Sequence, residues 1–295
     1  MDLKKELETY QELINSELEK VIEMEKLPES LLNESAKYSL LAGGKRLRPI
    51  LMLETYKLFK DNINECMPFA ISMEMIHNFS LIHDDLPGID NDDFRHGKPT
   101  NHRRYNEATA ILAGDLLLNG AYDNIAKYLM TKTETNSELK ARAFKRFSHS
   151  VERMIIGEYV DTECEGKEIS AEYLEYIHMN KTGALIKGSV RIGAILAGAS
   201  EEDIEKVTKY ASNIGFAFQI QDDLLGVIGN EKEFGKPIGS DIKNKKVTYV
   251  SKFGIDEAKR EVKELTEEAI KCLENFGGKE EFLKELAIYM MKRRA

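Results

Sequence analysis

The sequence predicts an all-α fold, built as one domain of ten or more helices over residues 1–295. Glu, Lys, Leu, Ala and Ile dominate the composition, and only six of the 295 residues are proline. Apolar residues recur every three or four positions, while runs that alternate apolar and polar residues are few. Hydrophobic residues make up 42% of the chain, which is enough for a sizeable core. We therefore expect almost no sheet.

Helix-breaking residues divide the N-terminal half into separate amphipathic segments. The first helix is expected to stop near Pro28, the second at Gly43-Gly44, and Pro49 suits the first turn of the third. A strongly apolar helix must break at Pro87-Gly88. The helices expected in this half cover residues 3–25, 29–42, 45 onward, 64–86, 106–130 and 137–164.

The C-terminal half continues the helical pattern without a linker or a low-complexity tract. Ser200 followed by three acidic residues is typical of a helix N-terminus, and we expect that helix to end after Asp223. A loop rich in Gly and Lys covers residues 229–246. The helices expected in this half cover residues 171–198, 200–223, 247–275 and 279–292.

Charge, cysteine content and hydropathy exclude several functional classes. The net charge of −9 argues against non-specific nucleic-acid binding, which needs a basic face. The three cysteines lie far apart with no CxxC spacing, so we expect reduced thiols. The most apolar stretch, residues 184–199, contains Lys187 and Arg191 and is too short for a membrane span of about 20 residues. The first residues lack the features of a signal peptide, and we expect a cytoplasmic protein.

Two pairs of adjacent carboxylates end apolar helical segments, where negative charge is costly unless a cation binds. These are Asp84-Asp85, with Asp90 in the following turn, and Asp222-Asp223. Carboxylate oxygens suit Mg²⁺, which usually takes one or two of them and fills its shell with water and substrate phosphate. Two opposed aspartate clusters therefore favour a diphosphate held by several metal ions. One pair alone would more often be an exposed acidic helix end.

The helix before Asp84 can bring further groups to the same place. On an ideal helix His77 and Asp84 lie within about 20° of one stripe and roughly 10 Å apart. Asp90 would point about 120° away from Asp84 on a straight helix, so only the Pro-Gly break lets it return. A core histidine is the simpler interpretation of His77 taken alone.

Basic residues near helix breaks are candidates for phosphate binding in an acidic protein. Lys181 differs from the others because a buried-looking run follows it, and an unpaired ammonium there would be costly, so we expect an anion partner. The remaining basic residues fall in three places: Lys45 with Arg48, Arg95 with Lys98, and Lys236 with Lys246. Each alone could be a solvated surface charge.

The chain resembles the short-chain trans-polyprenyl diphosphate synthase family, most closely its bacterial farnesyl diphosphate synthases. The matching motifs occur in the family's order and cover almost the whole chain. They are Gly43-Gly44-Lys45-Arg46-Leu47-Arg48-Pro49, Asp84-Asp85-x4-Asp90, Arg95-x-Gly97-Lys98-Pro99-Thr100, Ala113-Gly114-Asp115, Lys181-Thr182-Gly183-Ala184, Phe218-Gln219-x-x-Asp222-Asp223 and Gly235-Lys236-x-x-Gly239-x-Asp241.

This resemblance implies a helical bundle around a central cavity, usually as a homodimer, and a Mg²⁺-dependent prenyltransferase. An allylic diphosphate ionises, the double bond of isopentenyl diphosphate attacks the cation, and a proton leaves, giving farnesyl diphosphate from dimethylallyl or geranyl diphosphate. Three ions would bind together with the substrate diphosphate. The implied catalytic residues are Asp84, Asp222 and Lys181.

The resemblance also implies which residues bind which group. Metal would be bound by Asp84, Asp85, Asp90 and Asp222, with Asp85 supporting the others. The allylic substrate would be held by Arg95, Lys181, Thr182, Gln219, Lys236 and Lys246. Isopentenyl diphosphate would be held by Lys45, Arg48, His77 and, in part, His96.

Phe79 and Ser80 lie on the helix that leads to the first aspartate motif. Phe79 comes five residues before Asp84 and lies roughly 7 Å deeper by helical rise. In the family a bulky residue here limits the growing chain, which implies a product of three isoprene units. Taken alone, Phe79 would be core packing.

Three positions depart from the family pattern. His96 stands where an arginine usually contacts isopentenyl diphosphate, so affinity could depend on pH. Gly226 replaces the last aspartate of the second motif, which weakens the expectation of a third metal ion. Glu158, after Gly157, stands where glutamine is common.

Three other functions remain open from the sequence. The first is a geranylgeranyl diphosphate synthase, which differs only in chain length. The second is a class I terpene synthase, although Lys45, Arg48 and His77 argue against it because a cyclase needs no isopentenyl diphosphate site. The third is a weakly active partner subunit of a hetero-oligomeric synthase, in which His96 and Gly226 would be signs of decay.

Overall fold

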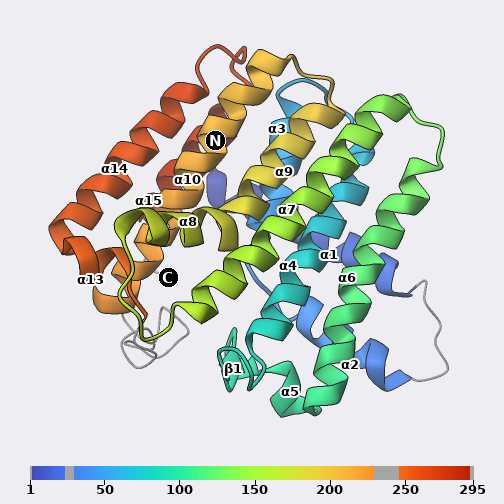
Figure 1. Ribbon diagram of the computed structural model, residues 1–295. Coiled ribbons are helices and arrows are strands. Elements are labelled where there is room, and N and C mark those ends of the chain that lie inside the picture. The colour runs from blue at the N-terminus through green and yellow to red at the C-terminus, as the bar shows by residue number, and fades with distance from the viewer. Residues whose placement is uncertain (1, 24–29, 229–245, 293–295) are drawn as a thin grey trace.

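The computed structural model describes residues 2–23, 30–228 and 246–292, and nearly all of its regular structure is helical (Figure 1). Within the described helices, none is both long and apolar enough to cross a membrane. The N-terminal half contains α1 (Leu3–Glu23), α2 (Ser30–Leu40), α3 (Leu47–Lys57), a short 3-10 helix (Ile63–Glu65), α4 (Met67–Asp84), β1 (Phe94–Arg95), β2 (Lys98–Pro99), α5 (Asn101–Arg104) and α6 (Glu107–Leu129).

The C-terminal half adds helices that pack along the first set. They are α7 (Ser137–Glu163), α8 (Ala171–Lys181), α9 (Gly183–Leu196), α10 (Glu201–Ile228), α13 (Tyr249–Phe253), α14 (Ile255–Cys272) and α15 (Glu281–Lys292). Figure 1 shows α10, α14 and α15 on one side and α2 and α6 on the other, with α4, α7 and α9 between them.

The all-α prediction is confirmed, and sheet is limited to one small hairpin in the described residues. In that hairpin Phe94 pairs with Pro99 and Arg95 with Lys98. Most expected helices are present with shifts of a few residues at their ends. Ser200 begins α10 as expected, because its hydroxyl accepts a hydrogen bond from the Asp203 N–H at 3.1 Å.

Three expected boundaries were wrong. The helix expected over 171–198 is two helices, α8 and α9, with Thr182 between them. The helix expected over 247–275 is divided at Gly254, whose φ of 83° no right-handed helix can hold. Helix α10 runs on to Ile228 instead of ending after Asp223.

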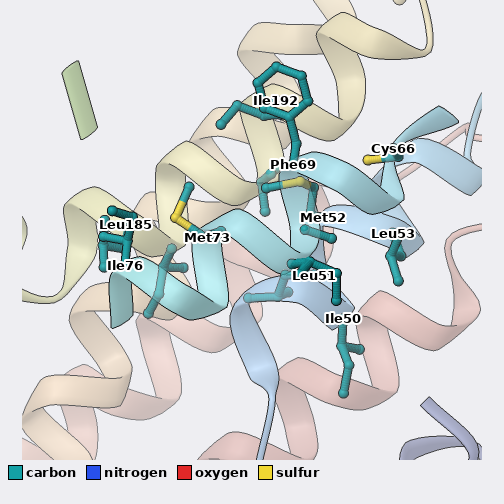
Figure 2. Packing of buried hydrophobic residues seen from close by; sticks show 14 of the residues in the cluster. Ile50, Leu51, Met52, Leu53, Cys66, Phe69, Met73, Ile76, Leu185 and Ile192 are labelled. Carbon is teal, nitrogen blue, oxygen red and sulfur yellow. The ribbon is translucent and has the colours of Figure 1, made fainter. Parts of the chain in front are cut away.

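The core lies where α3, α4 and α9 meet, and this contact fixes the position of the helix that carries the first aspartate motif. Figure 2 shows side chains from the three helices packed together: Ile50, Leu51, Met52, Leu53, Phe69, Met73, Ile76, Leu185 and Ile192. All of these are nearly or fully inaccessible to solvent. Burying a side chain of this size contributes about 1.5–3 kcal/mol, so α4 is firmly held.

Candidate active site

The turn after α4 returns Asp90 to the end of the helix that carries Asp84. The Asp90 N–H donates to the Asp84 carbonyl oxygen at 2.8 Å, and the Asn91 N–H donates to the Leu86 carbonyl oxygen at 3.1 Å. These bonds close the chain around Pro87-Gly88. The Pro-Gly break therefore brings the two carboxylates together, as the helix geometry required.

Lys181 ends α8 and binds two carboxylates on α7. Its Nζ lies 2.7 Å from Asp161 Oδ2 and 2.9 Å from a Glu158 carboxylate oxygen. The expected anion partner of this lysine is thus supplied within the chain. Gly157 permits the contact, because a Cβ there would lie 2.2 Å from the Lys181 backbone nitrogen. The two helices could not approach so closely with any larger residue.

Lys246 joins the same group of charges from the segment before α13. Its Nζ lies 2.9 Å from Asp90 Oδ1, 3.4 Å from Asp161 Oδ2 and 3.3 Å from Glu165 Oε1. Lys246 was expected at the allylic substrate, and it lies beside the first aspartate motif. Sequence reasoning did not assign Asp161, although it lies on the same face of α7 as Glu158, one turn later.

This site holds more negative than positive charge. Burial raises the pKa of Asp84 to about 8, and the Glu158 carboxylate adds to the rise, although Lys181 and Arg95 oppose it. Burial also raises the pKa of Glu158. Burial acts to raise the pKa of Asp161 too, but Lys181 and Lys246 outweigh it and hold that pKa below its usual range. A bound cation would relieve the remaining repulsion.

The donors around Asp84 fit a hard divalent cation. They are carboxylate oxygens, the ligands that Mg²⁺ prefers, and they lie at the helix end where charge is in excess. Among the residues that the structure describes, no group of three or more acidic, His or Cys side chains is arranged to hold a metal ion by itself.

Asp85 lies differently from Asp84, although it is adjacent in the chain. The Arg95 Nε donates to both Asp85 carboxylate oxygens at 2.9 Å, and the Arg95 Nη2 donates to Oδ1 at 2.5 Å. The Asp85 side chain is 4% exposed. This arrangement favours the supporting role expected for Asp85, with Arg95 on the hairpin held against the end of α4.

The second aspartate motif lies on α10. The Tyr249 N–H donates to Asp223 Oδ2 at 2.6 Å, which fixes the start of α13, and His178 Nε2 lies 3.9 Å from the same oxygen. The negative charge of the Asp222 carboxylate acts to raise the pKa of Arg48, a residue of the motif that begins at Gly43-Gly44, against the larger effect of burial. Gln219 lies one turn before Asp222 and is half-buried. Gly226 lies within α10, so no side chain supplies a carboxylate there.

A second group of basic residues lies near Arg95. Burial is the main cause that lowers the pKa of Arg48, and its Nε has no hydrogen-bond partner. The pKa of His77 is well below its usual value, first through burial and then through the positive charges of Arg48 and Arg95. His77 is therefore neutral near pH 7. The positive charge of Arg95 lowers the pKa of both His77 and Asp84, so the two groups of residues are neighbours.

Arg46 organises this second group, although sequence reasoning gave it no role. Its side chain is 2% exposed, and its Nη1 lies 2.7 Å from Glu74 Oε1 on α4. Its Nε donates to Asn15 Oδ1 at 3.0 Å, and its Nη2 donates to the Leu40 carbonyl oxygen at 2.7 Å. Arg46 thus ties α1, α2 and α4 to the loop that carries Lys45 and Arg48.

The remaining predicted residues have the following positions. Lys45 is exposed, and Thr182 is half-buried between α8 and α9. His96 lies in the hairpin turn, with its Nε2 3.9 Å from the point where a Cβ of Gly44 would lie. Lys236 lies outside the described residues.

Phe79 and Ser80 lie on α4, one turn or more before Asp84. Phe79 is 7% exposed, and its ring meets the His83 ring edge-on with centroids 4.8 Å apart. The Ser80 hydroxyl donates to the His77 carbonyl oxygen at 3.0 Å. Ser80 is therefore tied back to its own helix, and Phe79 is the bulky group at this depth.

Comparisons with known proteins show the family to which the chain is similar. The family model described as polyprenyl synthetase matches residues 29–288. A geranylgeranyl diphosphate synthase from Cyanophora paradoxa is 43% identical over 90% of this chain and 88% of its own. A farnesyl diphosphate synthase from Micrococcus luteus is 40% identical over 90% of both chains. The crystal structure of a geranylgeranyl pyrophosphate synthetase from Pyrococcus horikoshii superimposes with a TM-score of 0.90 at 30% identity, covering 99% of this chain and 98% of the other.

Proposed function

The chain belongs to the polyprenyl synthetase family of prenyltransferases, and we propose that it condenses isopentenyl diphosphate head-to-tail with dimethylallyl or geranyl diphosphate to give farnesyl diphosphate. The observation that carries this proposal is the presence of two neighbouring groups of residues, each with a member whose pKa the charge of Arg95 lowers. One is rich in carboxylates and lysines around Asp84, and the other is rich in cations around Arg48 and His77. Two such groups suit two diphosphate substrates bound side by side.

The residues around Asp84 would receive the allylic diphosphate. Asp84 and Asp90 from the end of α4, together with Asp222 from α10, would hold Mg²⁺. When bound, magnesium supplies positive charge that stabilises the departing pyrophosphate. Lys181 and Lys246 would then exchange part of their contact with Asp161 for the substrate phosphates. Arg95 stays fixed by Asp85 and would donate its outer N–H groups.

The residues around Arg48 would receive isopentenyl diphosphate. The unpartnered Nε of Arg48 is a ready donor for a phosphate oxygen, and exposed Lys45 adds a second positive charge. His77 is neutral here, so it would donate one hydrogen bond without adding charge. The released pyrophosphate, lying between the two groups, would accept the proton lost after bond formation.

Three ions would complete the allylic site, and Gly226 bears on the third. Without a carboxylate at position 226, the ion on the α10 side would rest on Asp222, water and substrate phosphate. We infer weaker binding of this ion than of the ions at Asp84. Titration of activity with Mg²⁺ would then show one ion that binds in the millimolar range.

A second copy of the chain is the proposed partner, and α6 offers the surface. Ile111 and Leu112 on α6 are 42% and 54% exposed, although both are apolar. Adjacent exposed apolar side chains often lie at interfaces between subunits. Light scattering on the purified chain should give twice the monomer mass, and Leu112→Glu should shift it toward monomer. A monomeric wild-type protein would contradict this.

Turnover by the purified chain alone distinguishes the proposed function from its rivals. A condensing enzyme needs both diphosphates and Mg²⁺, whereas a terpene synthase consumes an allylic diphosphate without isopentenyl diphosphate. A partner subunit would be inactive alone and would gain activity from a second protein. Product release in the absence of isopentenyl diphosphate, or no turnover with both substrates, would reject the proposal.

A further inference from the structure

Four basic side chains surround the contact between α7 and α9, outside the candidate active site. The two helices pack along each other in the middle of the bundle (Figure 1). They touch closely, because a Cβ on Gly188 would lie 2.3 Å from Ser150 Oγ. We call the four residues on either side of this contact the basic cluster. It consists of Arg146 and Arg153 on α7 and of Lys187 and Arg191 on α9.

The basic cluster has little opposite charge near it, although the whole chain has a net charge of −9. Neither the Lys187 ammonium nor the Arg146 guanidinium makes an ion pair or a hydrogen bond with a residue that the structure describes. Within the described part of the chain, Arg153 binds only neutral partners, Asn180 at 2.8 Å and Tyr176 at 3.0 Å. Most of the positive charge of the cluster is therefore not offset by nearby carboxylates of the described residues.

Arg191 has the one acidic contact within the cluster among the described residues, and that contact is weak. Its Nη1 lies 3.8 Å from Glu205, whose side chain is 77% exposed. The Arg191 Nε is buried without a hydrogen-bond partner. An exposed pair at this distance contributes little, so Arg191 still has donors to offer.

A neighbouring basic residue of the same helix is neutralised by an ion pair, unlike the members of the cluster. Arg142, one turn before Arg146 on α7, forms an ion pair with Glu201. Within the cluster, burial lowers the pKa of Lys187, and the charges of Arg146, Arg191 and Arg153 lower it further. The four cations thus repel one another in the structure as it stands, and an anion would relieve the repulsion.

We propose that the basic cluster binds a small anion with two or more linked phosphate groups. Two guanidinium groups on one helix, with an ammonium and a guanidinium on the other, suit several phosphate oxygens, since guanidinium groups bind phosphate with two parallel bonds. All four side chains are half-buried along the α7–α9 contact. A compact anion can reach them better than a flat lipid surface can. Inorganic pyrophosphate and a nucleoside triphosphate share this chemistry.

The test uses the full chain and isothermal titration with pyrophosphate and, separately, with ATP, both without divalent metal. The double variant Arg146→Gln with Lys187→Gln removes half of the cluster, and Arg142→Gln is the matched control. We expect the double variant to lose at least about tenfold in affinity for one binding event, while Arg142→Gln binds as the wild type does. The difference between titrations reports the cluster alone, because every variant keeps the active-site residues.

The ratio of the two affinities identifies the source of the phosphate chain. Equal affinity of the double variant and the wild type for both anions would overturn the proposal. Binding to anionic vesicles without binding to either anion would overturn it as well. Because the substitutions remove repulsion, the double variant should melt at or above the wild-type temperature without ligand. The single variant Lys187→Gln should show a smaller loss of affinity for the anion and should also melt at or above the wild-type temperature.

Discussion

Lys181 Nζ lies 2.7 Å from Asp161 Oδ2, an ion pair that joins the end of α8 to α7 beside the first aspartate motif. Burial alone would lower the pKa of Lys181, but Asp161 and Glu158 outweigh it and raise the pKa above its usual value. The ammonium is therefore charged and positioned before any substrate binds. A group fixed in advance costs little to orient during the reaction.

Gly157→Ala should separate Lys181 from its place in the site. The new Cβ would lie 2.2 Å from the Lys181 backbone nitrogen, so α8 must move away from α7. We expect a loss of about 1–3 kcal/mol in the free energy of unfolding, together with a fall in kcat. Gly215→Ala is the matched control, because its Cβ would meet the nearest atom at an ordinary 3.5 Å. Equal behaviour of the two variants would contradict the role of Gly157.

Asp84→Asn should stabilise the protein without ligand while it abolishes turnover. The pKa of Asp84 is raised to about 8 from its ordinary value of 3.8, so between these pH values the folded protein holds a proton that the unfolded chain has lost. Protonated Asp84 therefore contributes fully to the free energy of unfolding below about pH 4, and this contribution is lost as the pH rises to about 8. In EDTA at pH 8, the free energy of unfolding of Asp84→Asn should exceed that of the wild type by about 1–2 kcal/mol. This difference should vanish near pH 4.

Thermal unfolding across this pH range measures the effect. Asp123→Asn is the control, since Asp123 is an exposed carboxylate 2.6 Å from Lys127 and should change stability by less than about 0.5 kcal/mol. A pH-independent difference between Asp84→Asn and the wild type would contradict the crowding of carboxylates around Asp84.

Glu74→Gln should weaken isopentenyl diphosphate binding more than allylic substrate binding. It breaks the buried pair with Arg46, which holds the loop that carries Lys45 and Arg48, so KM for isopentenyl diphosphate should rise about tenfold. Glu54→Gln is the matched control, because Glu54 is a buried glutamate paired with Lys57 at 2.7 Å. Loss of the Glu54–Lys57 pair should lower the free energy of unfolding. It should leave the ratio of KM for isopentenyl diphosphate to KM for the allylic substrate unchanged. A similar change of both KM values in both variants would show that Arg46 only stabilises the fold.

The group of residues around Asp84 could in part be predicted from the sequence. The Asp84 and Asp90 carboxylates follow from a helix that a Pro-Gly pair must break, and the need of Lys181 for an anion follows from the cost of a buried ammonium. The identity of that anion could not be predicted, since Asp161 and Lys181 lie on helices whose packing depends on Gly157. Arg46 was missed for the same reason. Its partners lie on three different helices, and no local spacing indicates them.

The divided helices show a second limit of local patterns. Thr182 and Gly254 interrupt segments whose apolar spacing continues across the break, so the pattern predicted one helix in each case. Propensity alone disfavours these residues only weakly within a long helix. At Gly254 the backbone takes a positive φ, which the apolar spacing does not encode.

Phe79→Ala should lengthen the product. Removing the buried ring on α4 opens space five residues deeper than Asp84, so products of twenty carbons or more should replace the fifteen-carbon product. The truncation should also cost about 3–5 kcal/mol of stability. Phe282→Ala removes another buried ring, on α15 against Tyr10, and should cost stability without any change of chain length. Unchanged products from Phe79→Ala would place the length limit elsewhere.

The most direct measurement is the chain length of the product that the purified protein makes from labelled isopentenyl diphosphate with dimethylallyl or geranyl diphosphate and Mg²⁺. After removal of the phosphates, chromatography should show a fifteen-carbon alcohol, and EDTA or Asp84→Asn should abolish it. Absence of elongated product with the wild-type protein, or full activity of Asp84→Asn, would contradict the account.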